Sequence, residues 1–196
     1  MRRSWCLILI AAAATAGCDS SATTEVAKVG VGDDLRLSVD GNAGRIAATG
    51  GGKYLLQGIV EVQFAFSSIQ HADGKAMGQF HQKFDNGGPV VDVSGTVTCM
   101  AVDPVMRRAW IGGVITKNES TDPSVSGGIF EPGHDVWFRV VDYGEGSNAS
   151  QPDRTTFLGF ENNPTIKSSA QYCAERPWPE GDARTWPVTE GNIQVH

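Results

Sequence analysis

The sequence predicts an all-β domain, an antiparallel small β-barrel of about seven to nine strands. Short segments alternate between apolar and polar residues and are separated by turn formers. The 24 Gly and 9 Pro suit many turns, and no long window follows a helical period. The stretch 59–66 is too apolar for an exposed sheet edge, which favours a closed barrel. A two-sheet β-sandwich is the alternative.

The clearest pair of strands lies within residues 58–84. Apolar residues fill one face of its first strand, namely Val60, Val62, Phe64 and Phe66. Asp73 and Gly74 supply a chain reversal, because both residue types tolerate turn conformations. The return strand, 74–84, has Phe80 and Phe84 on a common side. This hairpin is expected to begin the core.

Further strands are expected along the rest of the chain. They lie at 34–39, 54–69, 90–102, 107–117, 135–142, 154–160, 168–173 and 191–196. Loops are expected at 41–53, 118–128, 143–152 and 176–187, where Gly, Pro, Asn and Ser gather. In the 90–102 strand, Val91, Val93, Val97 and Cys99 fall on one face, and Gly95 marks a bulge.

The first residues have the organisation of an export signal. Arg2 and Arg3 precede a short apolar run at 7–14, which is too short for a membrane-spanning helix. Ala16 and Gly17 before Cys18 resemble the bacterial lipobox. The resemblance implies that residues 1–17 are removed and that Cys18 carries fatty acyl chains. An ordinary signal peptide cleaved nearby is the alternative.

The lipobox resemblance implies a three-part organisation. Residues 1–17 form the lipoprotein signal peptide, 18–53 the lipidated N-terminus with a flexible tether and a weakly structured segment, and 54–196 the β-domain. Two or more acyl chains give stable anchoring, so the expected location is the outer side of a bacterial envelope membrane. Asp19 resembles the signal that retains lipoproteins in the inner membrane.

Cysteine usage supports an extracytoplasmic domain. The lipobox resemblance implies that Cys6 leaves with the signal and that Cys18 carries lipid, so Cys99 and Cys173 remain. A disulfide between them is expected in an oxidising compartment. Two free buried thiols are the alternative.

Net charge limits the class of partner. Loss of Arg2 and Arg3 reduces the 16 basic residues to 14 against 22 acidic ones, a formal charge of −8. An acidic chain without basic runs is not expected to bind nucleic acid. No cofactor motif is present: the glycines at 50–52 before Lys53 lack the context of a phosphate-binding loop.

A set of short motifs resembles a group of uncharacterised bacterial secreted proteins and lipoproteins built on a β-domain. They are H-A-D-G at 71–74, G-T-V-T-C at 95–99, W-I-G-G at 110–113, V-V-D-Y-G-E-G at 140–146 and G-N-I-Q-V-H at 191–196. The resemblance runs from about residue 54 to the end, with Tyr143 where the group has Asn. It implies no particular activity, and it leaves a recognition role open for the 71–74 turn.

Histidine and aspartate residues form one weak candidate site. His71 and Asp73 share the hairpin tip, and His81, His134 and Asp135 offer further metal ligands. Local metal-ligand spacing is missing, so turn and surface roles are favoured and no metal is predicted.

An oxygen-rich loop is a weak calcium candidate, with Asp142, Glu145, Asn148 and Asp153 as ligands. Its spacing departs from the calcium-loop pattern, and turn-forming hydrogen bonds are the favoured role.

The tryptophans form the last candidate. Trp110 and Trp137 are candidate contacts for a ligand or partner, and Trp178 and Trp186 are further pocket candidates. Packing of strands and of the Pro-rich loop is the favoured alternative.

No pattern for a catalytic nucleophile is found. The leading hypothesis is a membrane-anchored envelope domain that binds an envelope protein or ligand, or has a structural role, without catalysis. The alternative is a small barrel carrier or enzyme for an apolar small molecule, which requires an interior cavity.

Overall fold

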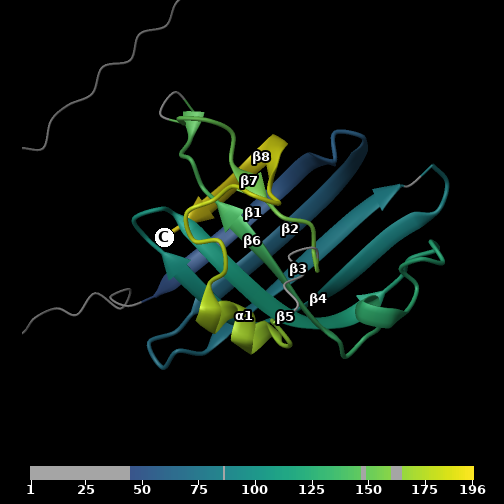
Figure 1. Ribbon diagram of the computed structural model, residues 1–196, viewed down its shortest axis with the longest axis horizontal. Helices are drawn as coiled ribbons and strands as arrows, with labels where there is room; N and C mark the ends of the chain where they lie inside the picture. The colour runs from purple at the N-terminus through teal and green to yellow at the C-terminus, as the bar shows by residue number, and fades with distance from the viewer. Residues whose placement is uncertain (1–44, 86, 147–148, 160–164) are drawn as a thin grey trace, which may run out of the picture. The chain divides into compact units, whose positions relative to one another are not determined.

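The computed structural model describes residues 45–85, 87–146, 149–159 and 165–196. These residues fold into strands with one short α-helix; short connections join the first five strands, and longer ones join the last three (Figure 1). The strands are β1 (Ile46–Leu56), β2 (Val60–Gln70), β3 (Ala76–Asp85), β4 (Val90–Asp103), β5 (Arg108–Asn118), β6 (Asp135–Val141), β7 (Arg154–Thr155) and β8 (Trp186–Val195). The helix α1 spans Ser169–Glu175, and a 3-10 turn spans Gly128–Phe130.

Each strand pairs antiparallel with the next in sequence, and β8 pairs with β1. The sheet therefore closes into an eight-stranded barrel in simple up-and-down order. The predicted barrel is confirmed, and the sandwich alternative is wrong. Because the sheet closes, both edges of the apolar strand β2 are paired, one with β1 and the other with β3.

The strand β1 corrects the prediction of a loop at 41–53. It pairs with β2 from Ile46 opposite Gln70 to Leu56 opposite Val60. A Cβ on Gly50 would lie 2.6 Å from the Phe66 ring, so glycine here makes room for a core aromatic. Among the described residues, the first barrel strand therefore starts at Ile46, before the expected boundary at residue 54. The strand expected at 34–39 lies outside the described residues.

The strand expected at 54–69 is divided by a turn. Gln57 and Gly58 both have positive φ, and the Ile59 amide donates to the Leu56 carbonyl at 3.0 Å. The apolar alternation continues across this turn, which is why the pattern alone suggested one strand. The second turn, at residues 71–75, lies where it was predicted.

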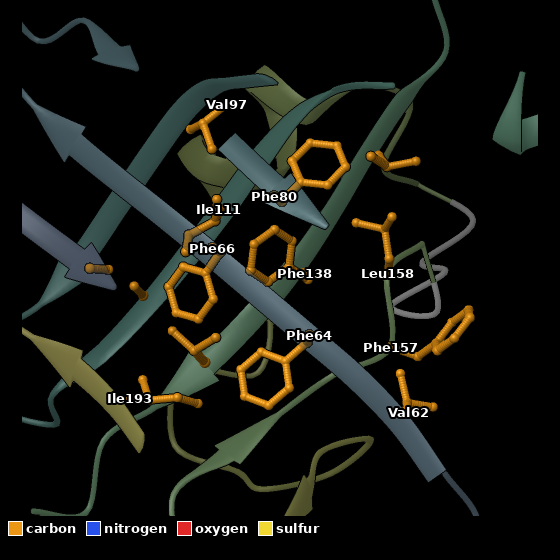
Figure 2. Packing of buried hydrophobic residues seen from close by; sticks show 14 of the residues in the cluster. Val62, Phe64, Phe66, Phe80, Val97, Ile111, Phe138, Phe157, Leu158 and Ile193 are labelled. Carbon is orange, nitrogen blue, oxygen red and sulfur yellow. The ribbon is translucent and has the colours of Figure 1, made fainter. Parts of the chain in front are cut away.

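The barrel interior is packed with side chains. Val62, Phe64 and Phe66 of β2 are buried and alternate with exposed residues, as predicted. The Phe138 ring of β6 meets Phe66 and Phe80 edge-on, with ring centroids 5.5 and 6.1 Å apart (Figure 2). Residues from all around the barrel thus share one core.

The pairing of β4 with β5 contains two register shifts, one at Ser94/Gly95 and one between Val97 and Cys99. At the first shift the extra residue is Thr116 of β5, so the bulge predicted at Gly95 lies on the partner strand and not on β4. The second reverses the alternation, so Val97 and Met100 face the interior core while Cys99 packs in a separate cluster. The expectation that Cys99 shares a face with Val91, Val93 and Val97 is therefore wrong.

The segment 168–173, predicted as a strand, is the start of helix α1. Ser168 caps it, because its side chain accepts a hydrogen bond from the Gln171 amide. Arg176 ends it in a left-handed conformation, with φ of 48°. The predicted disulfide between Cys99 and Cys173 is present and ties α1 to β4. The helix lies against β4 and β5.

The last strands differ from the prediction in length. The strand expected at 154–160 pairs only at Arg154 and Thr155. The terminal strand begins earlier than expected, at Trp186, and docks against β1. Its early residues include Trp186, which stacks on Tyr54 at a centroid distance of 6.1 Å.

Candidate binding surface

The barrel interior has little room for a ligand. Between Phe64, Phe66, Phe80, Phe138 and Leu158 the remaining void is about 10 Å³. A water molecule needs at least that volume, and drug-sized ligands need several hundred Å³. A carrier or enzyme that encloses an apolar molecule in this barrel is therefore not favoured.

The residues of the 71–74 turn are used in local structure. Asp73 accepts a hydrogen bond from the Lys75 amide at 3.0 Å, and Gly74 donates to the His71 carbonyl. The Nε2 atom of His71 is buried and without a hydrogen-bond partner among the described residues. The structure pairs His81 with Asp92 instead, and His134 with Glu131.

Trp110 and Trp137 lie on the outer side of the barrel wall, beneath α1. Trp110 is 1% exposed, and its indole N–H donates to the Pro177 carbonyl at 2.8 Å. Trp137 stacks on Tyr172 of α1 at a centroid distance of 5.8 Å. Both rings attach the helix and the following loop to the barrel.

The calcium candidates close a gap in the barrel wall. The strand β7 is so short that β8 lacks a full partner on that side. Asp153 accepts from the Ile193 amide at 2.7 Å, and Asp142 accepts from the Val195 amide at 3.0 Å. These carboxylates therefore replace the carbonyl groups of a neighbouring strand.

The other contacts of these carboxylates are structural too. Asp142 also accepts from Arg107 at 2.5 Å, and Asp153 from the Tyr143 amide at 2.8 Å. Burial raises the pKa of Asp153, while its two backbone N–H donors act in the opposite direction. Glu145 accepts from the side chains of Asn192 and Gln194. Asn148 lies outside the described residues.

No metal site can be assembled from the parts of the chain that the structure describes. Within them, no group of three or more His, Cys, Asp or Glu side chains is placed to hold an ion.

A pair of arginines was missed at the sequence level. Arg108 of β5 and Arg139 of β6 are 1% and 0% exposed. Both donate to the carbonyl oxygens of Trp178 and Gly181, at distances of 2.6–3.1 Å. Burial and the neighbouring Arg139 charge lower the pKa of Arg108. These hydrogen bonds hold the 176–185 loop on the barrel. The sequence signal for this buried pair was the presence of an arginine in each of two apolar strands.

The outer face of the barrel carries an open groove of about 480 Å³, here called the outer groove. It crosses strands β2 to β5. The side chains of its exposed lining are small or uncharged apart from one imidazole, and belong to Ala65, Ser67, Gln79, His81, Ser94, Thr96 and Thr116. A second groove of about 390 Å³ shares Ala65 and His81 with it and reaches Lys53 and Glu190. No sequence signal marked this surface, because strand pairing creates it.

Charged residues border these grooves in pairs. Asp92 lies 2.8 Å from His81 Nε2 and 2.9 Å from Lys83 Nζ. Burial alone would raise the pKa of Asp92, but hydrogen bonds from Lys83 and His81 outweigh it and hold the pKa below its usual value. Lys53 lies between Glu61 and Glu190, at 3.2 and 3.3 Å.

Comparisons with protein families, with curated proteins and with solved structures found no match. Among the described residues, no helix has the length and hydrophobicity needed to cross a bilayer.

Proposed function

We propose that this protein is a lipid-anchored domain of the bacterial envelope that binds a ligand or partner through the outside of its barrel. The observation that carries the proposal is the contrast between its two surfaces. The void between the aromatic rings of the interior is about 10 Å³, whereas the outer groove offers about 480 Å³ of open space.

The disulfide supports an extracytoplasmic location, because structural disulfides form and persist in oxidising compartments. The lipobox-like sequence at 15–18 supports anchoring through Cys18, with Asp19 favouring the inner membrane. The resemblance to secreted and lipoprotein β-domains points to the same compartment.

Binding without catalysis is the favoured mode. The polar side chains of the groove include one histidine, His81. Its imidazole is hydrogen-bonded to the carboxylate of Asp92. Nucleophilic catalysis needs an activated nucleophile beside such a base, and no hydrogen bond joins His81 to a serine or threonine in the described residues.

The anchoring is tested by expressing the full chain and its Cys18→Ser variant in a bacterial host. We expect mass spectrometry to find a mature N-terminus at Cys18 carrying acyl chains, and the variant to lose both lipid and detergent-phase partitioning. Lipid on the Cys18→Ser variant, or a wild-type chain cleaved elsewhere without lipid, would contradict the proposal.

A further inference from the structure

The outer groove has an ordered hydrogen-bonding surface. Ser67, Gln79 and Thr96 lie directly opposite one another on β2, β3 and β4. Ala65, His81 and Ser94 form the adjacent cross-strand row. Since outward side chains of paired residues stand about 5 Å apart, the two rows present polar groups at regular intervals across the strands. An extended ligand lying across the barrel would meet them in succession.

The small residues of these rows create the space. Ala65, Ser67 and Ser94 cannot fill the surface between the longer Gln79 and His81 side chains. Opposite Ser94 and Gly95, Thr116 is an extra residue that bulges β5 at the side of the groove. A Cβ on Gly95 would lie 2.2 Å from the Phe80 ring, so glycine lets the wall curve closely over the core.

The neutral groups of the groove are available to a ligand. Within the described residues, the side chains of Ser67, Gln79 and Thr96 make no hydrogen bond, and all three are exposed. Hydroxyl and amide groups each donate and accept. A ligand that alternates donors and acceptors can therefore satisfy this lining.

The charges near the groove argue against an ionic ligand. Lys83 and His81 share Asp92, and Lys53 is held between Glu61 and Glu190. An anionic ligand would have to displace these partners, and the chain as a whole is acidic, with a formal charge of −6.

A peptide strand is disfavoured by the closed sheet. Strand addition needs an unpaired edge. The gap beside β8 is occupied, because Asp153 and Asp142 accept from the amides of Ile193 and Val195. A polypeptide would meet only side chains on this face.

We propose that the outer groove binds a neutral glycan chain, whose hydroxyl and amide groups match the lining in charge and in hydrogen-bonding capacity. This proposal rests on the proposed function as an envelope binding domain and names its ligand class. The contacts are the hydroxyl groups of Ser67 and Thr96 and the amide of Gln79, with His81 at the edge.

The test uses the detergent-solubilised full chain and isothermal titration calorimetry with three neutral hexasaccharides: chitohexaose, cellohexaose and maltohexaose. A double variant, Gln79→Leu with Thr96→Val, removes hydrogen-bonding groups from exposed positions while keeping side-chain size. We expect at least one hexasaccharide to bind, and the double variant to bind it about tenfold more weakly, as the loss of two hydrogen bonds implies. Gln151→Leu, at an exposed position outside the groove lining, is the matched control and should bind as wild type does.

Heparin hexasaccharide and a neutral decapeptide are titrated in parallel. Failure of all three neutral hexasaccharides to bind overturns the proposal, as does equal affinity in the double variant or preferential binding of heparin or the peptide. Lipid anchoring is measured separately by mass spectrometry. A chain that binds a hexasaccharide but carries no lipid supports glycan binding in the outer groove and contradicts anchoring through Cys18. A lipidated chain that binds none of them overturns the groove alone.

Discussion

At the scale of single residues, Gly78 and Gly74 both have positive φ, but only Gly78 also lacks room for a side chain. Gly78 has φ of 156°, and a Cβ there would lie 1.8 Å from the Ser67 carbonyl oxygen. Gly74 has φ of 83°, with nothing within 4 Å of its Cβ position. Both are unfavourable for other residues, but at Gly78 a neighbouring strand also occupies the space.

Gly78→Ala is therefore expected to reduce the free energy of unfolding by roughly 3 kcal/mol or more, through combined strain and steric overlap. Gly74→Ala, the control, should cost only about 1 kcal/mol, the strain of a left-handed conformation. Urea denaturation of both variants checks this. Equal losses would show that the backbone at Gly78 moves easily to admit a side chain.

Asp92 provides a residue-scale prediction on pH. Its folded-state pKa is lowered from 3.8, so its ion pairs stabilise the protein above that pH, and this stabilisation is lost as pH falls through the lower, folded-state pKa. Asp92→Asn should be less stable than wild type by about 1 kcal/mol or less at pH 7, as is usual for surface ion pairs. The difference should disappear once the pH lies below the folded-state pKa of Asp92, as measured by denaturant titration at decreasing pH. A difference that persists in acid would assign the effect to packing.

At the scale of elements, helix α1 depends on a cap and a disulfide. Ser168 starts the helix, and Cys173 joins it to Cys99 of β4. The helix in turn covers Trp110 and positions the loop held by Arg108 and Arg139.

Replacing both cysteines, Cys99→Ala with Cys173→Ala, should lower the free energy of unfolding by about 4 kcal/mol, because the bond closes a long loop in the unfolded chain. Ser168→Ala should cost about 1 kcal/mol through loss of the cap, and Ser150→Ala, at an exposed loop position, should cost little. Calorimetry on the three variants tests this order. A double cysteine variant as stable as wild type would contradict it.

The elements also show why some predictions failed. The segment 168–171 reads S-S-A-Q, and Ser followed three positions later by Gln is a helix-start signal, which proved stronger than the alternation that predicts a strand there. In β1, the glycines predict a loop, but Gly50 is part of the strand. It lies opposite Phe66 of β2, whose ring leaves no room for a side chain at this position. In β4, the register shift between Val97 and Cys99 turned Cys99 to the other side, and strand alternation does not reveal such a shift.

At the scale of the whole molecule, the filled interior makes a direct prediction. Phe138 contacts Phe66 and Phe80 near the barrel centre. Phe138→Ala should reduce the free energy of unfolding by about 3–5 kcal/mol and leave an apolar cavity. Such cavities bind benzene, whereas the wild-type barrel should not.

Denaturation and benzene titration followed by NMR measure both effects. Val105→Ala, at a side chain that is 87% exposed, is the control and should change stability by less than about 0.5 kcal/mol. Binding of benzene to the wild-type interior would restore the carrier hypothesis.

The sequence by itself determined the all-β class and the buried face of β2, because alternation is a local feature. The bond between Cys99 and Cys173 was expected only because the lipobox resemblance set Cys6 and Cys18 aside. Tertiary structure alone decided the roles of Asp142 and Asp153. Their carboxylate oxygens accept hydrogen bonds from backbone amides of β8 that lie some 40 or more positions away in the sequence. It also decided the outer groove, since Ser67, Gln79 and Thr96 become neighbours only through the register of three strands. Residues far apart in the chain are brought together by strand pairing and closure, and a pattern read along one strand does not contain that information.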